Sequence, residues 1–82
     1  MGMAAARKVR RSMELLEYIL GIELLCGAQA VGFRRPLRSG PRVEEAIQRI
    51  RARVPELEED RPIGIDIESV AELVRNGALA EV

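Results

Sequence analysis

One long helix at the start of the chain constrains the fold more than any other feature. Residues 3–31 contain no proline, and most of them are the strong helix formers Ala, Leu, Glu, Arg and Met. From Met13 onward the apolar residues fall on nearly every face: Leu15, Leu16, Tyr18, Ile19, Leu20, Ile22, Leu24, Leu25, Cys26, Ala28, Ala30 and Val31. A helix that is apolar all round must be enclosed by other protein or by lipid. Because the rest of this 82-residue chain is too short to wrap it, we expect the helix to pack against other chains, with Leu24 at the interface.

Enclosure by lipid is not favoured. The most apolar window, residues 18–33, is shorter than the ~20 residues that a bilayer requires. Glu23 lies near its middle, and a central acidic residue costs at least ~2.5 kcal/mol on insertion scales. The start of the chain also lacks the short apolar core and cleavage site of a signal peptide. The sequence therefore predicts a cytoplasmic protein with no membrane partner.

The charged residues are balanced overall, with 13 basic and 13 acidic side chains, but unevenly distributed. The first 40 residues are mainly basic and the remainder mainly acidic, so the two halves could attract each other within a chain or between chains. Arg7, Lys8, Arg10 and Arg11 form a basic turn. This turn could contact phosphate or nucleic acid, or it could be a solvated face that pairs with acidic groups of a neighbouring subunit. Since no aromatic residues are interleaved, nucleic acid is not the expected partner.

Small residues and prolines mark the middle of the chain. Gly21 and Gly27 cost a helix about 1 kcal/mol each relative to Ala, which is understandable if another helix packs close to the backbone there. Residues 32–41 contain two glycines and two prolines, and predict a connector in which Phe33 and Leu37 pack inward. Its arginines, Arg34, Arg35 and Arg38, are expected to be exposed.

Two shorter helices are predicted after the connector, at about 42–54 and 66–76, so that residues 1–82 form a single all-α domain. The first carries a one-sided apolar stripe of Val43, Ala46, Ile47, Ile50 and Val54. The second carries Ile67, Val70, Ala71 and Val74. Asp66 is the expected N-cap of the last helix, and Asn76-Gly77 is a typical C-cap signal. The five residues after Gly77 are expected to fold back onto the stripe or to fray.

The loop at 55–65 is acidic, through Glu58, Glu59 and Asp60, and Asp66 follows it. The spacing of these carboxylates does not match an EF-hand loop, so we expect a solvated acidic loop and no metal site.

The residues offer no self-sufficient active site. The chain has no histidine, which removes the commonest general base and metal ligand. Cys26 is its only cysteine, has no neighbouring base in the sequence, and is expected to be a buried, reduced structural residue. Glu14, Glu17 and Glu23 are possible acid–base groups, but nothing in the sequence indicates a pocket around them. We therefore predict no catalytic, cofactor-binding or metal-binding residues.

Two runs of the sequence resemble a known family. AAARKVRRSMELLEYILGIELLCGAQAVGFRRPL is similar to the last part of the histidine ammonia-lyases, of the aromatic amino acid lyase family, and IELLCGAQAVGFR–RPL is its most specific piece. VPELEEDRPIGIDIESVAELVRNGAL resembles the far C-terminal end of the same enzymes, in the same order and spacing. The likeness covers essentially the whole chain and is closer to the bacterial histidine enzymes than to the plant phenylalanine enzymes.

The resemblance implies a part of a helical homotetramer whose central helices associate as a bundle. Enzymes of this family eliminate ammonia from histidine to give urocanate, with an electrophile built from an internal Ala-Ser-Gly that does not occur in this chain. The family's late active-site segment, a Gln-Glu-Asp run ending in Ser-Met-Gly, also lies upstream; Met1-Gly2 resembles its tail. None of the family's catalytic residues matches a position here, so the chain alone is predicted to be inactive.

Three functions follow from these observations. The chain could be an association module that forms dimers or tetramers through its long helix, as a natural short protein, a truncated product or a fragment. It could be a subunit of a split ammonia-lyase whose partner chain carries the electrophile. It could also be a lyase relic reused as a small binding or regulatory protein, with the basic turn or Arg34, Arg35 and Arg38 as its contact surface.

Overall fold

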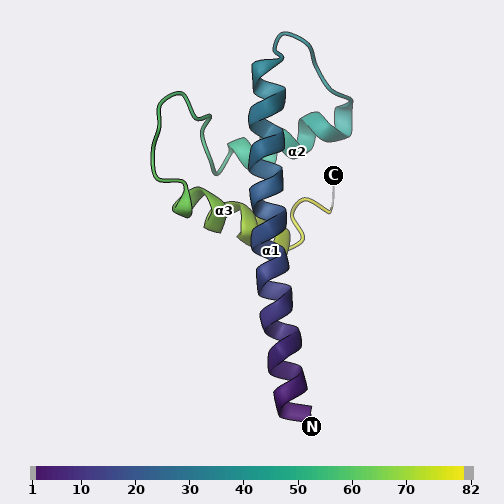
Figure 1. Ribbon diagram of the computed structural model, residues 1–82. Helices are drawn as coiled ribbons and strands as arrows, with labels where there is room; N and C mark the ends of the chain where they lie inside the picture. Colours follow the sequence, from purple (N-terminus) through teal and green to yellow (C-terminus); the bar gives the residue numbers. More distant parts are fainter. Residues whose placement is uncertain (1, 81–82) are drawn as a thin grey trace.

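The fold is all-α, as the sequence predicts. The computed structural model describes residues 2–80, in which three helices and no strands are found: α1 (Gly2–Phe33), α2 (Pro41–Arg51) and α3 (Gly64–Arg75) (Figure 1). Three residues lie outside the described part of the chain: Met1, Glu81 and Val82. Part of the resemblance and part of the expected C-terminal fold-back fall on them.

The three helices do not form three equal layers. In Figure 1, α1 is the central rod, α2 and α3 lie across its C-terminal half, and its N-terminal half extends away from them. The described chain measures 54 × 29 × 16 Å, and a 32-residue helix is itself about 48 Å long. The length of the molecule is therefore the length of α1.

A close approach of backbones fixes α3 against α1. A Cβ atom added to Gly21 would lie 3.2 Å from the backbone nitrogen of Ala71 and 3.4 Å from the carbonyl oxygen of Ile67. The expectation that a helix packs against Gly21 is confirmed, although the packing helix belongs to the same chain. Gly27 has nothing of the described chain within 4 Å of the corresponding position, so the expectation that another helix packs there stays a prediction.

The buried core is small and lies where the three helices meet. It consists of Ala28, Ile50, Val54, Val70 and Leu73. Leu24, Leu25, Ala78 and Leu79 pack against this core. Leu24 therefore packs partly against the chain's own core, and its expected place in an intermolecular interface stays a prediction. Leu24 turns toward α2 and α3 together with Ala28, one turn further along α1.

The ends of α2 and α3 differ from their expected positions. α2 ends at Arg51, although Val54 is buried in a turn that follows it. α3 begins at Gly64 with Ile63 as its N-cap, and no side chain caps it. Asp66 is not the N-cap because it already lies in the first turn, where its carboxylate accepts a hydrogen bond of 3.2 Å from Nε of Arg61.

The C-terminal end of α3 is as predicted. Asn76 is the C-cap, and Gly77 has a φ of +76°, a left-handed conformation that glycine adopts at little cost. Ala78 and Leu79 then return to the core, so the described part of the last residues folds back.

The connector packs through charge rather than through its apolar residues. Phe33 and Leu37 are 80% and 72% exposed, so the prediction that they pack inward is wrong. Instead Glu44 of α2, only 8% exposed, forms ion pairs in which its Oε1 lies 2.7 Å from Nη1 of Arg35 and 3.4 Å from Nη2 of Arg38. The sequence analysis missed this buried carboxylate, although three nearby arginines in a ten-residue connector are a signal for an acidic partner.

Candidate association surface

Most of the large apolar side chains of α1 are exposed. Those that are at least one-third exposed are Met3, Val9, Met13, Leu15, Leu16, Ile19, Leu20, Ile22 and Phe33. Within α1 only Gly21 and Ala28 are buried. A continuous apolar surface of this length marks an interaction site on a folded chain.

The exposed residues of α1 form two seams. The first seam is Val9, Met13, Leu16 and Leu20, and the second seam is Leu15, Ile19, Ile22 and Cys26. In both, successive residues are alternately four and three positions apart, which is the spacing of coiled-coil contacts. At about 100° per residue the centres of the two seams lie about 120° apart around the helix, with Glu23 between them. A helix with two such seams can pack against two neighbouring helices at once.

The side of α1 that α2 and α3 cover is called its closed side here. Polar contacts join it to α3. Tyr18 donates a hydrogen bond of 2.8 Å to the carboxylate of Glu68, and this bond raises the pKa of the Tyr18 hydroxyl. Nε of Arg75 donates a bond of 2.9 Å to Glu17, which raises the pKa of the Arg75 guanidinium. These contacts orient α3 and leave the seams uncovered.

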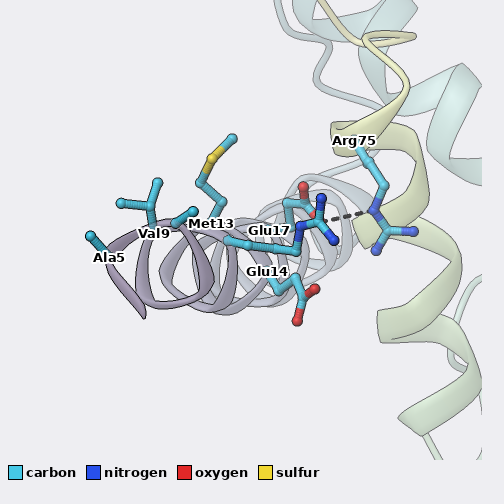
Figure 2. A pocket seen from close by; sticks show the side chains of 8 residues that line it. Ala5, Val9, Met13, Glu14, Glu17 and Arg75 are labelled. Atoms are coloured by element: carbon cyan, nitrogen blue, oxygen red, sulfur yellow. Dashed lines mark hydrogen bonds and ion pairs between the residues drawn. The ribbon is translucent and has the colours of Figure 1, made fainter. Parts of the chain in front are cut away.

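Figure 2 shows where the closed and open sides of α1 meet. A shallow groove of about 680 Å³ is bounded by Ala5, Val9 and Met13 on the free half of α1, and by Glu17 and Arg75 where α3 begins to cover the helix. The apolar side chains point away from the Glu17–Arg75 pair. The groove is open to solvent and offers an edge for a docked helix rather than an enclosed substrate site.

Opposite charges mark the two ends of α1. The basic turn, Arg7, Lys8, Arg10 and Arg11, is exposed on the free half. The acidic loop, Glu56 to Asp60, lies at the other end, where Nε2 of Gln29 donates a 3.0 Å hydrogen bond to the carbonyl oxygen of Leu57. Glu56, Glu58, Glu59 and Asp60 are exposed.

The structure does not assemble the candidate chemical residues into one site. Cys26 is exposed, so its expected burial is wrong; it lies on the second seam, beside a hollow that Arg51 of α2 and Asp66 of α3 also line. Glu14 pairs with Arg11 and Glu17 with Arg75, while Glu23 is exposed. Within residues 2–80 no group of three or more His, Cys, Asp or Glu side chains could hold a metal ion.

The arrangement describes an all-helical segment with an uncovered interaction surface, and comparison with known proteins places it in a family. Residues 1–52 match the family model of the aromatic amino acid lyases, and the chain belongs to this family. Over 79 residues, or 96% of this chain, it is 52% identical to a histidine ammonia-lyase of Anaeromyxobacter sp. (strain K). It is 48% and 43% identical to the histidine ammonia-lyases of Symbiobacterium thermophilum and Natranaerobius thermophilus over the same share. The resemblance seen in the sequence is confirmed.

The chain spans 16% of the length of these relatives. It is thus similar to one segment of a histidine ammonia-lyase, which agrees with the two runs that carry the resemblance. No solved structure matches the chain.

Proposed function

We propose that this chain is a histidine ammonia-lyase segment that acts as an association module, forming dimers or tetramers through the open face of α1. The observation that carries the proposal is the pair of exposed apolar seams on a helix whose closed side already packs on α2 and α3. Burying apolar surface contributes about 25 cal/mol per Å², so covering the two seams, which hold seven large apolar side chains and Cys26, strongly favours association.

The proposal places the chain in the cytoplasm without a membrane partner. By length and composition alone, α1 could cross a bilayer. Against insertion, Glu23 lies in its apolar half, and the polar residues Tyr18 and Glu17 are engaged by α3. Self-association covers the same apolar surface without moving Glu23 into lipid.

A second candidate function is a subunit of a split ammonia-lyase in histidine catabolism. It is supported by the family membership together with the small share of the relatives that the chain spans. In that case the open face of α1 docks on a partner chain that carries the Ala-Ser-Gly-derived electrophile. The chain itself contributes scaffold and no catalytic residue. Reuse of the chain as a small binding protein through its basic turn is the third, less supported alternative.

The test is the molar mass in solution, measured by light scattering with helicity from circular dichroism. The wild-type chain is expected at two or four times 9.1 kDa. Ile19→Arg places a charge on the second seam, where Ile19 is 52% exposed, and is expected to reduce the mass while the isolated fold remains. Ile65→Arg is the matched control, because Ile65 is 79% exposed at the start of α3, away from the seams.

A wild-type monomer, or an Ile19→Arg variant with unchanged mass, would overturn self-association. For the split enzyme, the chain is mixed with a lyase chain that ends just upstream of the matching segment. Ammonia release from histidine only in the mixture supports that alternative.

A further inference from the structure

We propose that two copies of this chain pack antiparallel along the second seam, so that Arg11 of each copy lies beside Glu56 of the other. The inference rests on the proposed association and specifies its orientation and register, which association alone leaves open.

The second seam is exposed, and the loop that follows α2 borders it at Cys26 and Gln29. Leu15, Ile19 and Ile22 are 46%, 52% and 45% exposed, and Cys26 is exposed beside them. Gly21 and Ala28, the buried residues of α1, lie on the roughly opposite side of the helix, where α3 and the core are. A second helix can therefore approach the seam without displacing α2 or α3.

One antiparallel register matches residues of the same kind along the seam. If Ile19 of one copy lies opposite Ile22 of the other, the helix repeat also places Leu15 opposite Cys26 and Ser12 opposite Gln29. Apolar residues then meet apolar residues, and the polar pair lies at the ends of the seam. One step further outward, Lys8 of one copy lies opposite Phe33 of the other, which brings a cation beside an aromatic ring.

The charges beside the seam distinguish this register from a parallel one. Arg11 lies on the edge of the seam that faces the loop, and in the antiparallel register it lies level with Ala30 of the second copy. The carboxylate of Glu56 lies beside Gly32, two residues or about 3 Å further along, since its Oε1 is 3.2 Å from the place of a Cβ on Gly32. The Arg11 side chain is 67% exposed and makes a 3.4 Å ion pair with Glu14 in its own helix.

A parallel pair would place like charges together. The basic turns of both copies would meet at one end and their acidic loops at the other, which opposes association. The antiparallel pair instead places each basic turn beside the acidic loop of the other copy. Arg35 and Arg38 lie near the same end of α1 as the acidic loop. Because both are already paired with Glu44, they repel the basic turn of the second copy less.

Disulfide trapping in the full chain tests the register, because Cys26 is the only cysteine. Leu15→Cys, oxidised with glutathione disulfide, is expected to form a covalent dimer joined through residues 15 and 26. Wild type and Leu15→Cys/Cys26→Ser are expected to form little or none, since each has one cysteine facing a non-cysteine residue. Leu16→Cys, which lies one residue away on the first seam, is the control for nonspecific oxidation.

Each other outcome overturns the inference. A wild-type dimer linked through Cys26 on both chains indicates a parallel pair. An associated Leu15→Cys variant that forms no more cross-link than Leu16→Cys excludes the register but leaves association intact. A chain that is monomeric by light scattering removes both the register and the proposed function.

A charge exchange provides a second, independent test. Arg11→Glu and Glu56→Arg are each expected to weaken dimerisation by at least about fivefold at low salt, and the double variant to recover most of the loss. Equal losses that simply add in the double variant would show that the two residues do not meet.

Discussion

Gly21 of α1 lies directly against the backbone of Ala71 in α3, with 3.2 Å between the Ala71 nitrogen and the place of a Cβ at residue 21. Backbone cannot move aside as a flexible side chain can. Gly21→Ala is therefore expected to lower the free energy of unfolding by about 1–3 kcal/mol, despite the better helix propensity of alanine. Equilibrium unfolding in urea, followed by circular dichroism, measures the change.

Gly27→Ala is the matched control for this contact. Nothing lies within 4 Å of a Cβ at Gly27, so alanine there is expected to raise the free energy of unfolding by up to about 1 kcal/mol. If both variants are more stable than wild type, the packing of the α3 backbone against Gly21 is contradicted.

Removing Ile50 tests the core where α2 meets the other helices. Ile50 is 2% exposed and belongs to a core of few residues, so Ile50→Ala is expected to cost about 2–5 kcal/mol and to abolish cooperative unfolding in so small a chain. Val43→Ala, at a position that is 50% exposed, should change stability by no more than about 0.5 kcal/mol. Comparable effects of the two substitutions would contradict the packing of α2.

Glu44 gives stability a defined pH dependence. The hydrogen bond from Arg35 holds the pKa of the Glu44 carboxyl below its ordinary value of 4.5. Because the folded-state pKa is depressed, the stabilisation is fully present above the unfolded pKa and is lost as pH falls through the folded pKa. Between about pH 5 and pH 3, wild type is expected to lose more of its unfolding free energy than Glu44→Gln, as measured by urea titrations across that range. Parallel curves for the two proteins would show that the connector does not depend on this ion pair.

The number and type of the helices could be predicted from the sequence because the signals are local. Periodicity predicts α2 and α3, and Asn76-Gly77 marks the end of α3. The close contact at Gly21 was predictable too, since a glycine inside an apolar helix has a cost that packing must offset.

The sequence does not predict which face of each helix packs against which other element. Apolar composition alone does not show that α3 covers Gly21 while leaving Ile19 and Cys26 open, nor that Leu24 turns inward. The connector packs through Glu44 and its arginines rather than through Phe33 and Leu37. The ion pair joins Arg35 of the connector to Glu44 of α2, nine positions later, and no periodic signal in the sequence reveals such a pair. Asp66 is not the cap because α3 begins two residues before it, at Gly64, and its carboxylate accepts a hydrogen bond from Arg61 instead.

The dependence of unfolding on protein concentration tests the central claim most directly, namely that another chain covers the open face of α1. If folding and association are coupled, the urea midpoint rises when the chain concentration is raised about 100-fold, and the rise disappears in Ile19→Arg. A wild-type midpoint that is the same at both concentrations, with full helicity retained, would show that the chain holds its fold with the seams exposed and would contradict the account.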